Sequence, residues 1–322
     1  MDDIHNIGKP GGILFRIIRK LISKKELYPR FDYQTQLLED RFIARKVIIK
    51  KQGNRNFEKL FKPLLGFDFL WIYLHGSQAD HTANSFSDID DLIVVDLDKM
   101  DRKVLIKFIQ ALNKVDLKFC RSDPLQHHSH FIISQQALKN YDASYLPLET
   151  LENSYRIKGP KIISYNMNPE RTRKGLLQNI IATSKEILSL FHGFRNHQIN
   201  LYNLKKLVGS FVLMPAFLFQ YSGEFLNKPM AILRANEIFS DSAYKCIEWS
   251  TNCRRNWHKV TNCKKFLRYS KLPYFFLNPH LYRIVGKKTS PELNLAEMDM
   301  QSLNATEVND FLQNTLTWLE KN

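Results

Sequence analysis

The sequence predicts an α/β domain followed by an all-α domain. Short, continuously apolar runs alternate with helical stripes in the first half of the chain, a pattern typical of α/β sheets. From about residue 169 onward, apolar residues recur only with the helical period. The length of 322 residues also favours two domains, because single cores rarely grow much beyond about 250 residues. We expect an N-terminal helical and basic segment at 1–56, the α/β domain at 57–165 and the helical domain at 166–322.

The α/β domain is expected to alternate helices and strands. Apolar residues at helical spacing predict helices near 57–64 and 104–115. The uninterrupted apolar run at 69–74 predicts a strand that is buried on both faces. The β-branched run at 88–95 predicts a second strand, and 130–133 predicts a third. A polar loop therefore joins the first two expected strands.

The second half of the chain contains further amphipathic stripes. They predict three helices, over 176–191, 201–221 and 227–239. A final helix is expected near the C-terminus, because Asn304 and Glu307 stand at capping-box spacing ahead of another apolar stripe. This half of the chain should therefore form a helical bundle.

Composition and charge limit the classes of protein. The chain is 44% hydrophobic with 12 Gly and 12 Pro, which excludes general disorder and a collagen-like structure. Four cysteines in this length do not form a disulfide scaffold. No uncharged apolar run of about 20 residues occurs, so we expect no transmembrane segment and a cytoplasmic location. The formal net charge of +15 favours polyanionic partners: nucleic acid, nucleotides or an anionic membrane surface.

The N-terminal segment has one amphipathic stretch. At 12–25, a stripe of Ile and Leu opposes a basic face. The simplest interpretation is a helix packed on the body of the protein. A helix lying on a membrane surface is the alternative.

The residues that indicate chemistry flank the loop between the first two expected strands. The first strand ends at Gly76-Ser77, and the second begins with Asp88 and Asp90. Residues two apart on a strand share a face, so the two carboxylates should lie together, with Asp91 on the opposite face. Such a pair repels unless a cation neutralises it, and Mg²⁺ prefers hard oxygen ligands together with substrate phosphates. Because Gly76 lacks a Cβ, a phosphate could approach its backbone closely.

A buried strand ending in Gly-Ser, a loop of about ten residues and Ser-Asp-Ile-Asp on the next strand resemble the nucleotidyltransferase superfamily, with the DNA-polymerase-beta-like fold. The resemblance covers roughly 57–134 and implies a small mixed sheet. It also implies that Gly76 and Ser77 contact the phosphates of a nucleoside triphosphate, and that Asp88 and Asp90 hold Mg²⁺ ions, with Mn²⁺ as a substitute. The implied reaction is in-line attack of an acceptor hydroxyl on the α-phosphorus, at a two-metal site.

The family normally supplies a third carboxylate from a later strand, and here its identity is open. The run at 130–133 contains no acid. We choose Asp123, which could stand at the entry of this strand, over Asp116. The alternative is that Asp123 only forms a turn with the following proline. In that case catalysis is in doubt or His128 contributes.

Histidines at 127, 128 and 130 invite a zinc interpretation, but no cysteine is in range to complete a site. We prefer a polar edge of the active site or structural hydrogen bonds.

Two features of the helical half bear on ligands. Asn227-Lys228 follows Gly223 and is similar to a helix start in small nucleotidyltransferases, which implies that Lys228 binds the triphosphate; the alternative is a solvated lysine. The stretch 249–291 has no Asp or Glu and combines basic with aromatic residues, which could bind RNA. A solvated basic face over core aromatics is the alternative.

The function expected from these observations is a Mg²⁺-dependent nucleotidyltransferase that moves a nucleoside monophosphate onto an acceptor hydroxyl. The acceptor could be RNA, such as tRNA, or a small molecule. The alternative is a catalytically inactive nucleotide- or RNA-binding protein on the same fold. A membrane-surface protein is a third interpretation. The base, the acceptor and the oligomeric state do not follow from the sequence.

Overall fold

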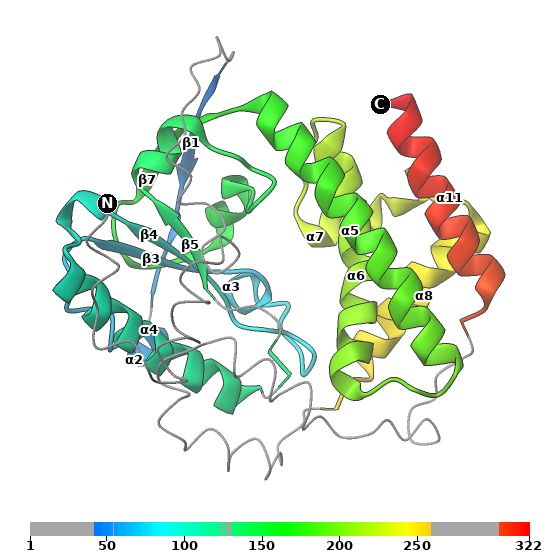
Figure 1. Cartoon of the computed structure of the whole chain (residues 1–322), viewed down its shortest axis with the longest axis horizontal. Coiled ribbons are helices and arrows are strands. Elements are labelled where there is room, and N and C mark those ends of the chain that lie inside the picture. The colour runs from blue at the N-terminus through cyan, green and yellow to red at the C-terminus, as the bar shows by residue number, and fades with distance from the viewer. Residues whose placement is uncertain (1–41, 54, 124, 127–129, 259–302) are drawn as a thin grey trace, which may run out of the picture.

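A computed structural model describes residues 42–53, 55–123, 125–126, 130–258 and 303–322. Over this part of the chain, an α/β region with a small mixed sheet lies beside a group of helices (Figure 1). The broad division that the sequence predicts is therefore confirmed. The expected N-terminal helix at 12–25 lies outside the described residues, as does most of the basic-aromatic stretch.

The main sheet has five strands in the order β2-β6-β3-β4-β5. Their bounds are β2 Lys51–Gln52, β3 Leu70–His75, β4 Asp90–Val95, β5 Phe131–Ser134 and β6 Tyr155–Lys158. The central strand β3 is antiparallel to both β4 and β6, whereas β4 and β5 are parallel. In the register of β3 and β4, His75 lies opposite Asp90, so the end of one strand meets the start of the other.

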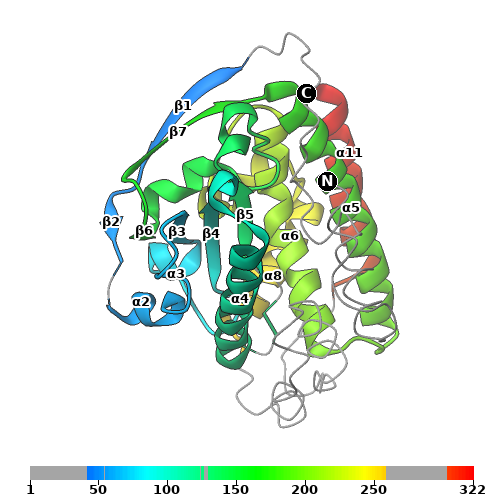
Figure 2. The same cartoon turned by 60° about the vertical axis from the view of Figure 1, so that its left-hand side comes forward.

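Two layers cover this sheet. On one face, α2 (Arg55–Phe61) and α4 (Arg102–Ser122) pack on β3 and β4, and Phe61, Phe108 and Ile93 share one core. The other face is covered by an antiparallel ribbon of β1 (Ile43–Ile48) and β7 (Ile162–Met167) and by the segment between β5 and β6 (Figure 2). The central strands are thus buried on both faces, as their continuous apolar runs predict.

Several strands differ from the sequence-based expectation. β1 and β2 lie within the segment expected to be separate at 1–56, yet they pair with β7 and β6. The α/β part therefore starts earlier in the chain than residue 57. β1 contains Arg45 and Lys46 and keeps most of its residues at least partly exposed, which weakens its apolar signal. The second expected strand starts at Asp90 rather than at Asp88.

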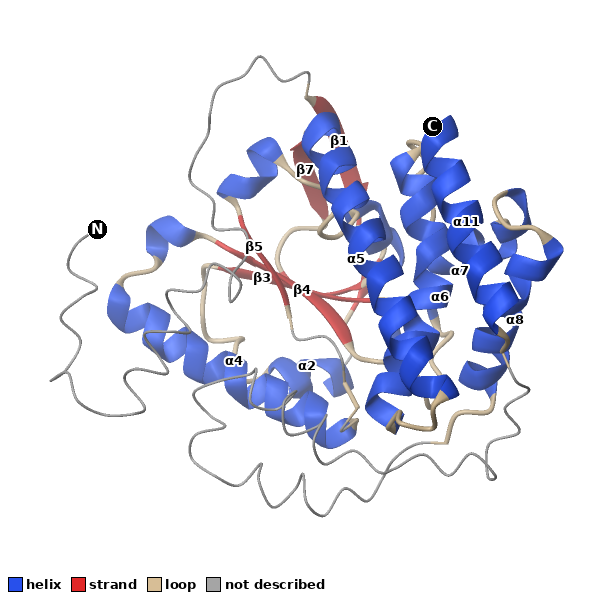
Figure 3. Cartoon of the chain, turned by 45° about the vertical axis from the view of Figure 1, so that its right-hand side comes forward, coloured by secondary structure: helices blue, strands red, loops and turns tan. Residues whose placement is uncertain are grey.

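The helical part comprises α5 (Pro169–Arg195), α6 (Leu201–Tyr221), α7, α8 and α11 (Figure 3). The expected helix at 227–239 is a short α7 (Lys228–Leu233) followed by the 3₁₀ turn η5 (Ala235–Glu237). α8 (Asp241–Arg255) has no counterpart in the expectation. α11 (Ala305–Lys321) begins with the predicted capping box, in which Asn304 and Glu307 each bond the other's backbone. None of the helices within the described ranges is long and apolar enough to cross a membrane.

Candidate functional site

The turn after β3 sets the geometry of the site. Gly76 has φ 70° and ψ −158°, a conformation that is essentially confined to glycine, and it caps the short helix α3 (Ser77–Asp80). A Cβ at this position would stand 2.6 Å from Oδ2 of Asp90. The absent side chain of Gly76 thus lets the carboxylate of Asp90 lie directly on the turn. Ser77 follows as the first residue of α3 and is half-buried.

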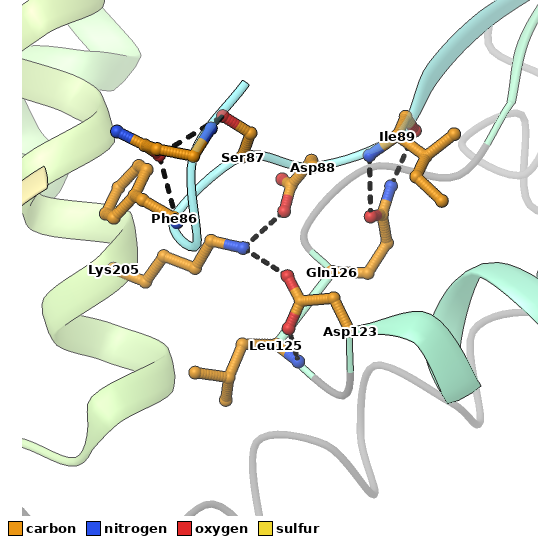
Figure 4. A network of polar contacts seen from close by, with 9 residues as sticks. Phe86, Ser87, Asp88, Ile89, Asp123, Leu125, Gln126 and Lys205 are labelled. Carbon is orange, nitrogen blue, oxygen red and sulfur yellow. Dashed lines mark hydrogen bonds and ion pairs between the residues drawn. The ribbon is translucent and has the colours of Figure 1, made fainter. Parts of the chain in front are cut away.

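Asp88 and Asp90 are fixed through the residue between them. The side-chain amide of Gln126 accepts a hydrogen bond from the backbone N–H of Ile89 at 3.0 Å. It also donates to the Ile89 carbonyl at 2.8 Å (Figure 4). Gln126 is buried, so both backbone groups of Ile89 are satisfied away from water. Asp88 therefore lies in the connection before β4, next to a residue whose backbone N–H and C=O are both bonded to Gln126.

A buried lysine joins Asp88 to Asp123. Lys205 of α6 donates to Oδ1 of Asp88, and its Nζ lies 2.6 Å from Oδ2 of Asp123 (Figure 4). The Lys205 side chain is only 2% exposed. Burial by itself would lower the pKa of Lys205, but the charges of Asp88 and Asp123 outweigh that effect and raise it. Lys205 belongs to no sequence motif, so pattern alone could not have identified this contact.

Asp123 stands at the C-terminal end of α4, the helix that packs on the sheet. Its Oδ1 accepts a hydrogen bond from the backbone N–H of Leu125 at 2.9 Å, while Oδ2 faces Lys205. Burial raises the pKa of Asp123, and the charge of Lys205 acts in the opposite direction. Asp123 thus lies at the end of α4 rather than at the entry of β5, which begins at Phe131, and it shares Lys205 with Asp88. β5 itself carries no acid, and Phe131 pairs with Leu92 of β4.

Two cations from the helical part approach the same region. Lys228 is the first residue of α7, whose N-cap Asn227 accepts a hydrogen bond from the Met230 N–H at 3.0 Å. The protein around the Lys228 ammonium lowers its pKa, although the residue as a whole is exposed. Arg254 lowers the Lys228 pKa further, whereas Asp90, Asp88 and Asp80 oppose the change. Lys228 therefore lies within electrostatic reach of both the expected metal ligands and a second cation.

Arg254 of α8 is a residue that the sequence placed only in a general basic stretch. Its guanidinium lies over the ring of Phe86 at 5.5 Å from the centroid, and Nζ of Lys205 lies 5.4 Å from the same centroid. Burial lowers the pKa of Arg254, and Asp80 opposes this. Within the described parts of the chain, Nε of Arg254 is buried without a hydrogen-bond partner. Both cations thus lie over the ring of Phe86, in the loop before β4.

The opposite face of β4 carries a separate buried network. Asp91 is fully buried, and Nδ1 of His130 lies 2.7 Å from its Oδ2. Nε2 of His130 lies 3.6 Å from Oδ1 of Asp116 on α4. Burial would lower the pKa of His130, but Asp91 and Asp116 raise it to about 9. His130 therefore has a structural role, and His127 and His128 lie outside the described residues.

The set of possible metal ligands is small. Among the residues that the structure describes, no group of three or more His, Cys, Asp or Glu side chains is arranged to hold a metal ion. Mg²⁺ needs fewer protein ligands than this, since it is commonly held by one or two carboxylates together with substrate phosphates and water. Asp90 lies beside the turn at Gly76, and Asp88 precedes Asp90 by two residues, so these two carboxylates could serve as such ligands. The residues present are therefore compatible with a magnesium ion that binds together with a phosphate substrate.

Comparison with known proteins assigns the chain to no family. No family model, no curated protein and no solved structure matches the chain.

Proposed function

We propose that this protein is a Mg²⁺-dependent nucleotidyltransferase with a DNA-polymerase-beta-like fold. It would transfer a nucleoside monophosphate from a nucleoside triphosphate to an acceptor hydroxyl and release pyrophosphate. One observation carries the proposal: Asp90 lies against the turn at Gly76, and the charges of Asp88, Asp90 and Arg254 all act on Lys228. Carboxylates for a metal and cations for phosphates are the two requirements of this chemistry.

The two cations suit a triphosphate. The charge of Arg254 helps to lower the pKa of Lys228, and burial lowers the pKa of Arg254 itself. A polyanion between the two cations would oppose both effects, and it would offer hydrogen-bond acceptors to the buried Nε of Arg254. Both cations come from the helical part and would hold the phosphates against the edge of the sheet.

The carboxylates have separate tasks in this proposal. Asp88 and Asp90 would hold Mg²⁺, which supplies charge neutralisation and polarises the reacting phosphoryl group when bound. Asp123, the residue chosen as the third carboxylate, would hold the ammonium of Lys205 beside Asp88. Gln126 keeps Asp88 and Asp90 in place through its two bonds to Ile89.

The acceptor is less constrained than the nucleotide. The net charge of +15 favours RNA over an uncharged small molecule. However, Trp249 and Trp257 are 7% and 5% exposed and pack in the helical core, so these two rings of the basic-aromatic stretch cannot stack on bases. RNA binding would therefore depend on the charge of this stretch more than on these rings.

Incubation with each α-³²P-labelled nucleoside triphosphate, Mg²⁺ and total cellular RNA tests the proposal. We expect label from one nucleotide to enter RNA or a small product, and Asp90→Asn to abolish this transfer while the fold, followed by circular dichroism, is retained. Asp68→Asn is the matched control, because Asp68 is an exposed acid just before β3. Nucleotide binding without transfer to any acceptor would instead support the nucleotide-binding alternative.

A further inference from the structure

The position of Lys205 bears on how many metal ions the site can use. Its ammonium contacts a carboxylate oxygen of Asp88 and one of Asp123 at the same time. A lysine that is 2% exposed is costly unless its charge is compensated, and two carboxylates compensate it here. The bridge between Asp88 and Asp123 is therefore made by a protein cation.

Lys205 is also fixed in this position by its surroundings. Its neighbours Leu204 and Leu207 on α6 are fully buried in the helical core. The ring of Phe86 lies beside its ammonium, 5.4 Å from Nζ to the centroid. Phe86 belongs to that same core, so the lysine is held by packing as well as by its ion pairs. It cannot leave the bridge without disturbing the helix and the loop before β4.

The ammonium of Lys205 lies between Asp88 and Asp123, where a divalent ion bridging these two acids would have to bind. A second divalent ion bridging Asp88 and Asp123 would have to share the place of the ammonium and would be repelled by it.

We propose that Lys205 takes the place of the second divalent ion, so that each site uses one divalent cation. This inference rests on the proposed nucleotidyl transfer, for which a two-metal site is the usual expectation. Lys205 supplies a fixed positive charge next to Asp88, and the single ion lies on the side of Asp90 and Gly76. A lysine cannot exchange with solvent as a metal ion can, so this part of the cationic charge of the site is permanent.

Electron paramagnetic resonance with Mn²⁺ tests the count. The full chain is saturated with Mn²⁺ and a non-hydrolysable α,β-methylene nucleoside triphosphate. Two Mn²⁺ ions about 3.5–4 Å apart, as in two-metal sites, are magnetically coupled, whereas one ion gives an uncoupled spectrum. We expect the uncoupled spectrum of one protein-bound ion for the natural chain. Lys205→Met removes the charge at similar length, and we expect it to admit a second ion and give the coupled spectrum.

Lys206→Met is the matched control, because Lys206 is exposed and pairs with Glu186 of α5 instead of with the acids of the site. It should behave as the natural chain does. A coupled pair of ions in the natural chain would overturn the single-ion inference and leave the proposed function intact. A nucleotide complex with no protein-bound ion would overturn both. The result for the natural chain decides the question even if Lys205→Met does not fold.

Discussion

The carboxylate of Asp90 occupies the space beside Gly76 that any other residue's side chain would fill. The gap between Asp90 Oδ2 and an ideal Cβ at position 76 is 2.6 Å, shorter than any real contact of that kind. The backbone of Gly76 is also in a region that other residues avoid. Glycine is thus required both by the turn and by the acid that lies against it.

Gly76→Ala should lower the free energy of unfolding by about 1–3 kcal/mol, because it introduces strain at φ 70° and displaces Asp90. Chemical denaturation measures this loss. Gly209→Ala in α6 is the control, since a Cβ added at Gly209 would meet nothing within 4 Å. It should stabilise the protein by about 0.5–1 kcal/mol through helix propensity. Equal changes in unfolding free energy for the two substitutions would show that the turn does not require glycine at position 76.

Gln126→Leu should loosen the two acids without altering either. The substitution leaves the N–H and C=O of Ile89 buried without their amide partner, at a cost of about 1–3 kcal/mol per unsatisfied group. We expect a lower denaturation midpoint and, in the transfer assay, a lower kcat. Gln136→Leu removes only an exposed bond to Asp98 and should leave both unchanged. A normal kcat for Gln126→Leu would show that the bonds to Ile89 do not position Asp88 and Asp90.

The His130 network should make stability depend on pH. The folded protein holds the His130 proton with a pKa of about 9, against about 6.5 for an unfolded histidine. Its contribution is therefore complete below pH 6.5 and is lost as the pH rises through 9, by up to ~3 kcal/mol. The difference in unfolding free energy between the natural chain and His130→Gln should shrink over that range.

Arg254→Ala should weaken binding of the triphosphate. Loss of a charged hydrogen-bond donor costs roughly 1.5–3 kcal/mol, which corresponds to a rise in the nucleotide Kd of about 10- to 100-fold. Arg255→Ala is the matched control, because the neighbouring Arg255 is exposed and bonds within α8, to Asn252. Isothermal titration calorimetry measures both. Equal affinities for the two variants would remove Arg254 from the site.

The sequence predicts the part of the fold that has strong local signals. The buried strands β3 and β4 and the capping box at Asn304 follow from continuous apolar runs and from residue spacing. β2 has only two residues, and β1 is largely exposed and contains adjacent basic residues, so neither has a recognisable period. Their place in the α/β part is set by pairing with strands more than a hundred residues later.

The candidate site shows the same limit. Local spacing identifies Asp88, Asp90 and Gly76, since they flank one loop. It cannot identify Gln126, Lys205 or Arg254, because their roles come from tertiary contacts with that loop and no short motif contains them. From the sequence, Asp123 could be chosen only because it is an acid near the start of an expected strand. Its contact with Lys205 depends on how α6 packs against the α/β part, which the sequence does not show.

The bridge through Lys205 also governs when the site can exist during synthesis of the chain. Lys205 is 117 residues after Asp88 and 82 after Asp123, so both carboxylates leave the ribosome well before their cation. Until α6 is made, Phe86 and Leu125 also lack the helical core in which they are buried. A nascent or truncated chain ending before α6 would therefore combine an uncompensated pair of acids with exposed apolar surface. The acids of the site therefore gain their cation only when α6 has been made and packed.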